Sequence, residues 1–173
     1  MFKKNQIFVL GSESFTALLG LVFLLLGYKY LPIEMPSTVN ISTMLSFFFK
    51  WLSLPTLTII LGVFLVMFKR ITTKAINPIL NVNENEYMKI FKQYLQNTLE
   101  QAVIFVFAQL GLISVLAPGY IKLIPLFAIL FFTGRIIFLA GYLYHPILRA
   151  PGFGLTFYPS VLVVLFVLYS LIF

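Results

Sequence analysis

The chain of 173 residues contains no cysteine and only one histidine, His145. Without cysteine there can be no disulfide, no thiol nucleophile, and no iron–sulfur or cysteine-ligated zinc site. A single histidine also argues against a histidine-based metal centre. We therefore predict that the protein has no metal site.

Charged residues are scarce as well, at 10% of the chain, whereas 61% of the residues are apolar and the mean hydropathy is +1.02. A soluble domain of this size could not bury so much apolar surface, which predicts an integral membrane protein. The net charge of +7 fits Lys and Arg gathered in cytoplasmic loops. Nucleic-acid binding is not expected, because no basic, aromatic-interleaved soluble segment is present.

Five apolar runs are long enough to cross a lipid bilayer, which takes about 20 residues in a helix. They cover about residues 15–31, with a start as early as Ile7, then 44–68, 87–116, 121–144 and 155–173. Continuous runs favour helices over barrel strands, so the predicted fold class is all-α, an integral membrane helical bundle. Pro55 predicts a kink in the second run.

The first run has no small-residue cleavage site after it, and we interpret it as an uncleaved anchor rather than a signal peptide. The breaks between the runs are rich in Pro, Gly or Asn, as turns are. One of them, "APGY", is so short that the third and fourth runs should form an antiparallel hairpin.

The basic residues divide unevenly between the two sides that five spans define. One side has Lys3, Lys4, Lys69, Arg70, Lys74, Lys89, Lys92 and Arg149, and the other has Lys29, Lys50 and Lys122. The positive-inside rule then predicts a cytoplasmic N-terminus and a C-terminus on the far side. The membrane would be a bacterial inner membrane or the endoplasmic reticulum.

Polar residues open the third run, in "QNTLEQ". Gln93, Asn97 and Glu100 are three or four residues apart and share one helix face. Polar groups at the edge of a hydrocarbon layer are costly unless something meets them. Two interpretations stay open: a site for a polar ligand, or hydrogen bonds that join neighbouring helices.

Ionisable residues inside the runs also need partners. Arg135 lies in the apolar segment "FFTGRIIFLAGY", and Glu100 is an acidic residue at similar depth. A Glu100–Arg135 pair is our structural hypothesis, and its role could be purely architectural. Glu13, in the first run, has no partner that we could assign. By position alone, Arg149 is a loop anchor on the positive side.

The segments "QYLQNTLEQ" and "GRIIFLAGYLYHPILRAPG" together resemble the MAPEG family, the membrane-associated proteins in eicosanoid and glutathione metabolism. The resemblance covers about residues 44–173, the last four runs. It predicts a four-helix MAPEG-like membrane domain at 44–173, preceded by an N-terminal transmembrane anchor and loop at 1–43. The additional first run is similar to the five-span branch of the family.

The resemblance implies a homotrimer that binds glutathione, as a co-substrate, between adjacent subunits near the cytoplasmic face. Asn97 and Glu100 match the pair that holds the glutathione backbone and amine, and Arg135 matches the helix Arg. Gln93 stands where the family has an Arg. A charge-assisted contact with a glutathione carboxylate is therefore lost or replaced.

The same resemblance assigns catalytic roles to Tyr142 and Arg149. Tyr142 matches the Tyr of a Gly-Tyr pair, and Arg149 matches the loop Arg that stabilises the glutathione thiolate in transferase members. Phe138 and Gln101 replace residues that are Tyr in some members.

Two functions follow from these observations. The leading one is a glutathione-dependent transferase or peroxidase acting on lipophilic electrophiles that arrive from the bilayer. The alternative is a non-catalytic family member that binds a lipid or a partner protein in the same cleft. A transporter is disfavoured, because no pair of spans repeats a broken-helix pattern.

Overall fold

A computed structural model of the chain describes residues 4–73 and 85–173. Within these ranges all the regular elements are helices, without strands, and the all-α fold class is confirmed. The elements are α1 (Lys4–Tyr30), α2 (Ile41–Trp51), α3 (Ser53–Ile71), α4 (Glu86–Val115), the 3-10 helix η2 (Pro118–Tyr120), α5 (Leu123–Tyr144), the 3-10 helix η3 (Pro146–Arg149) and α6 (Ala150–Ile172).

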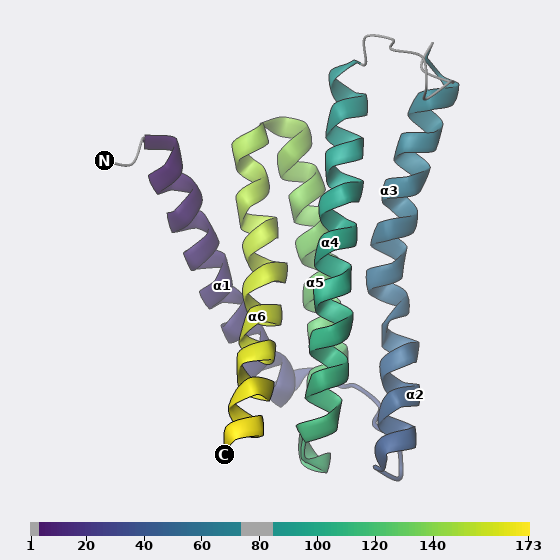
Figure 1. Cartoon of the computed structure of the whole chain (residues 1–173), viewed down its shortest axis with the longest axis vertical. Coiled ribbons are helices and arrows are strands. Elements are labelled where there is room, and N and C mark those ends of the chain that lie inside the picture. The colour runs from purple at the N-terminus through teal and green to yellow at the C-terminus, as the bar shows by residue number, and fades with distance from the viewer. Residues whose placement is uncertain (1–3, 74–84) are drawn as a thin grey trace.

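The helices form a bundle of five segments, each long and apolar enough to cross a membrane, and successive segments run in opposite directions (Figure 1). Helices α2 and α3 follow one another and together make the second segment. Helix α1 is tilted relative to the others and packs mainly on α6. With their many exposed Leu, Ile, Val and Phe side chains, these helices make an integral, multi-pass membrane protein.

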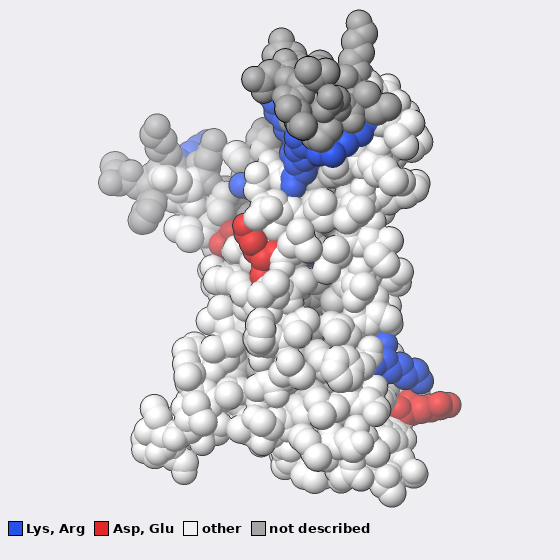
Figure 2. All heavy atoms as spheres, turned by 45° about the vertical axis from the view of Figure 1, so that its right-hand side comes forward, with Lys and Arg blue, Asp and Glu red and all other residues white. Residues whose placement is uncertain are grey.

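One end of the bundle carries most of the basic residues, and we call it the basic end. Here α1, α4 and α6 begin and α3 and α5 end, and the end carries Lys4, Lys69, Arg70, Lys89, Lys92 and Arg149. Blue Lys and Arg side chains gather near this end in Figure 2, and red acidic side chains lie just below them. Farther from this end the visible surface is uncharged except for blue and red side chains at the lower right. Lys3 and Lys74, predicted on the same side, lie outside the described residues.

The second span is broken just before Pro55, the residue at which a kink is predicted. Helix α2 ends at Trp51, and α3 starts at Ser53 after the single residue Leu52. Because Pro55 has no N–H to donate to the carbonyl of Trp51, the helical ladder is interrupted one turn before the proline.

Side-chain caps explain why two helices begin slightly earlier than hydropathy predicted. Asn40 accepts a hydrogen bond from the backbone N–H of Thr43 at 2.9 Å, and the Thr43 hydroxyl accepts one from the N–H of Asn40, also at 2.9 Å. Asn85 accepts a hydrogen bond from the N–H of Met88 at 3.0 Å. These caps satisfy backbone donors that a helix start leaves open.

The expected start of the last span, near residue 155, is wrong. Helix α6 begins at Ala150, so the Pro- and Gly-rich segment 150–154 is helical rather than a loop. Pro151 is tolerated because it occupies the first turn. Gly152 packs against the backbone of α5 and Gly154 against the backbone of α1, so the glycines permit close helix contacts.

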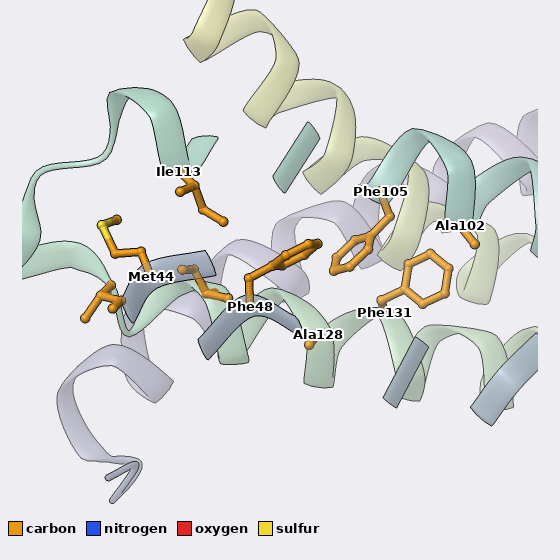
Figure 3. Packing of buried hydrophobic residues seen from close by; sticks show 9 residues of the cluster. Met44, Phe48, Ala102, Phe105, Ile113, Ala128 and Phe131 are labelled. Carbon is orange, nitrogen blue, oxygen red and sulfur yellow. The ribbon is translucent and has the colours of Figure 1, made fainter. Parts of the chain in front are cut away.

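A cluster of buried apolar side chains joins α2, α4 and α5 (Figure 3). In its centre the rings of Phe105 and Phe131 are 4.8 Å apart, and Phe48 and Ala128 lie beside them. Close packing of this kind fixes the register of α4 against α5. Residues one to two turns nearer the basic end are thereby held opposite each other.

Candidate functional site

Arg135 is the best-connected polar residue of the interior. Its side chain is 0% exposed. Its Nη1 donates to Oδ1 of Asn97 on α4 at 2.8 Å, and its Nη2 donates to the hydroxyl of Thr156 on α6 at 2.7 Å and to the carbonyl of Gly152 at 3.4 Å. One guanidinium group therefore ties three helices together.

Glu100 is not the partner of Arg135 within the subunit, and that hypothesis is wrong. Glu100 is exposed, and its carboxylate accepts a hydrogen bond from Nε2 of Gln96 at 2.9 Å. The reason is the rotation of α4: it turns Asn97 toward α5, so the face that carries Gln96 and Glu100 points away from Arg135. Among the described residues, all the acceptors that Arg135 meets are neutral, and its buried Nε has no hydrogen-bond partner.

A cavity of about 400 Å³ lies at the basic end, between α1, α4, η3 and the neighbouring turns of α5 and α6. Its polar lining residues are Glu13, Gln93, Asn97 and Arg149, and the rest of the lining is apolar and includes the ring of Phe138. A concave site of this volume, mostly apolar with a few convergent polar groups, is typical of small-molecule binding. We call it the polar cavity.

Arg149 is held at the edge of the polar cavity by an aromatic ring. Its guanidinium carbon is 4.9 Å from the ring centroid of Tyr142. Tyr142 in turn meets Phe138 edge to face at 5.9 Å, and the guanidinium of Arg135 lies 4.5 Å above Phe138. Cation–π contacts contribute about 0.5–2 kcal/mol each, and they leave the guanidinium N–H groups free to donate.

The structure thus brings most of the predicted site residues together. Gln93, Asn97 and Arg149 line the polar cavity, Arg135 lies behind Asn97, and Tyr142 lies behind Arg149. Two further residues were missed. Thr156 gave no signal in the sequence. Glu13 did give a signal, because it is an acidic residue in an apolar run, but its partner could not be assigned from the sequence.

Helix α1 forms one wall of the polar cavity, through Val9 and Glu13. The family resemblance implies a cleft between adjacent subunits. In this structure the cavity is closed on one side by a helix of the same chain.

These features define a multi-pass membrane protein with a polar cavity between its helices at the basic end. The model of the MAPEG family matches residues 48–169, and the chain belongs to this family. The matched range includes every site residue predicted from the sequence and excludes Glu13.

Two relatives are similar over most of the chain. Transmembrane protein 79 of Mus musculus is 26% identical over 143 residues, which cover 83% of this chain and 36% of the relative. Transmembrane protein 79 of Bos taurus is 26% identical over 133 residues, covering 77% and 33%. The chain therefore spans about a third of the length of these relatives. No solved structure matches.

Proposed function

We propose that the polar cavity binds glutathione and that the protein is a glutathione-dependent transferase or peroxidase acting on lipophilic electrophiles. The observation that carries this proposal is the place of Arg149, with its guanidinium at a small cavity that also contains the polar side chains of Gln93 and Asn97. Membership of the MAPEG family supports it. In this proposal the basic end is cytoplasmic, and the subunits form a homotrimer.

The proposed role of Arg149 is to hold the sulfur of glutathione as a thiolate. A thiol with an ordinary pKa of about 8.5 is mostly protonated at pH 7. A guanidinium beside the sulfur favours the charged form, which is the attacking species. The proton leaves to solvent, the sulfur forms a bond to the electrophilic atom, and the displaced electron pair stays with the leaving group.

Asn97 has a positioning and binding role in this proposal. Its Oδ1 accepts from Arg135, which leaves the amide nitrogen to donate to a carbonyl or carboxylate of the ligand. Because Arg135 is anchored on α6 through Thr156, the orientation of Asn97 is fixed before a ligand arrives. The apolar side chains around the cavity would admit a lipophilic electrophile from the bilayer.

A non-catalytic protein that binds a lipid or partner protein in the same cavity is the second candidate. It is favoured by Gln93, which is uncharged where family members have an Arg, and by Phe138, which lacks a hydroxyl. The following two experiments separate the candidates.

Replacing Arg149 with alanine is expected to abolish the thiolate of bound glutathione. Wild-type protein saturated with glutathione should show thiolate absorbance in the ultraviolet near neutral pH, and Arg149→Ala should not, because the charge that favours the anion is gone. Difference absorbance measures this directly. Arg70→Ala is the control, since Arg70 lies at the basic end but outside the polar cavity. A saturated wild-type complex without a thiolate signal would favour the non-catalytic candidate.

Replacing Gln93 with arginine is expected to tighten glutathione binding. One new charge-assisted hydrogen bond to a carboxylate contributes about 1.5–3 kcal/mol at most, or roughly 10-fold to 150-fold in affinity. Isothermal calorimetry gives the dissociation constants. Gln96→Arg is the matched control, because Gln96 is on the same helix but does not line the polar cavity. Equal affinities for wild type and Gln93→Arg would argue against a glutathione carboxylate at this position.

A further inference from the structure

Glu13 is an acidic residue inside a membrane-spanning helix, about two turns from its start. A carboxylate at such a depth is costly unless it meets a partner or a polar cavity, and ionisable residues of this kind usually mark a site. In this structure Glu13 lines the polar cavity, together with Arg149. Within the described residues the two opposite charges share the cavity without forming an ion pair.

The position of Glu13 is determined by close contacts with α6. A side-chain carbon added at Gly154 would lie 2.8 Å from the carbonyl oxygen of Glu13, so the two backbones touch at this point. The hydroxyl of Tyr158, also on α6, donates to Oε2 of Glu13 at 3.2 Å. This single bond uses one of several acceptor sites of the carboxylate, which keeps further acceptor capacity toward the cavity.

The polar cavity therefore offers a carboxylate on one wall and a guanidinium on another. This pattern is complementary to a zwitterionic ligand, with an ammonium group at Glu13 and an anionic group at Arg149. Glutathione has both kinds of group. The residue that the family resemblance assigns to its amine, Glu100, is exposed and bonded to Gln96 outside the cavity.

We propose that Glu13 binds the ammonium group of the ligand, so that α1 completes the site within one chain. The inference rests on the proposed function, because it takes glutathione as the ligand. It adds a specificity-determining residue outside the region that the family model matches. A ligand without the ammonium group would leave the half-buried carboxylate without a partner of opposite charge, and would bind more weakly.

The test compares glutathione with N-acetylglutathione, which lacks the ammonium group, by calorimetry on the full chain. Wild-type protein is expected to bind glutathione at least about tenfold more tightly, the effect of one hydrogen bond to a charged group. Glu13→Gln should bind the two ligands within about twofold of each other, by weakening glutathione. Glu13→Asp, which keeps the charge, should retain most of the preference. Glu100→Gln is the control and should retain all of it.

The outcomes separate the two proposals. If wild type binds glutathione and Glu13→Gln keeps the preference, the assignment of Glu13 is overturned and the proposed function stands. The same conclusion follows if Glu100→Gln abolishes the preference, because Glu100 would then be the acceptor. If wild type does not bind glutathione, both proposals are overturned. Thermal midpoints of the variants verify folding, and the new amide oxygen in Glu13→Gln can still accept from Tyr158.

Discussion

Lysine in place of Arg135 is expected to destabilise the protein more than methionine does. Lysine keeps the buried charge but cannot reach Asn97 on α4 and Thr156 on α6 at once, as the planar fork of arginine does. The loss of one or two hydrogen bonds to a charged group, at about 1.5–3 kcal/mol each, predicts a decrease of about 1.5–6 kcal/mol in the free energy of unfolding.

Methionine loses all three hydrogen bonds of Arg135 but also removes the charge from the apolar interior, which offsets the loss. Denaturant titration in detergent micelles measures both variants. Arg149→Lys is the control, because Arg149 is only half buried at the cavity edge and should change stability little. An Arg135→Lys variant as stable as wild type would show that the guanidinium fork does not hold the three helices together.

Alanine in place of Gly152 is expected to separate α5 from α6. The added carbon would overlap the backbone nitrogen of Phe138 and lie 2.5 Å from the carbonyl oxygen of Gly134. Backbone atoms cannot rotate away, so the helices must move apart, which costs about 3 kcal/mol at the upper end of overpacking effects. The shift would also displace the Gly152 carbonyl, which accepts from Arg135.

The same alanine substitution at Gly11 is the matched control. A carbon added there meets nothing within 4 Å, and helix propensity alone predicts a gain of up to about 1 kcal/mol. Denaturation midpoints of the two variants show whether alanine destabilises the protein at Gly152 but not at Gly11. Equal effects at both positions would mean that the close contact at Gly152 does not limit the packing of α5 on α6.

Local rules explain which parts of this fold were predictable. The five spans follow from the length of the apolar runs, and the break before Pro55 follows from the missing N–H of proline. The helical start of α6 did not follow, because Pro and Gly favour turns locally. In the structure, contacts of Gly152 with α5 and of Gly154 with α1 override that preference.

The site was predictable to the extent that helical spacing determines it. Periodicity placed Gln93 and Asn97 on one face, and both line the polar cavity. Periodicity also placed Glu100 on that face, but in the structure Glu100 bonds to Gln96 outside the cavity. The rotation of α4 against α5 depends on packing between helices, and residue spacing along one helix gives no information about it. The contribution of Glu13 to the cavity could not be predicted for the same reason. The apolar pattern of α1 does not indicate which helix α1 packs against.

The break between α2 and α3 also supplies an optical probe. Trp51 is the one tryptophan of the chain and the last residue of α2. Its ring meets Phe47 edge to face at 6.3 Å, and within the described residues its buried Nε1 has no hydrogen-bond partner. An unbonded indole in apolar surroundings fluoresces at shorter wavelength than one in water. Because Trp51 is not among the residues that line the polar cavity, its emission reports on the second span independently of ligand contact.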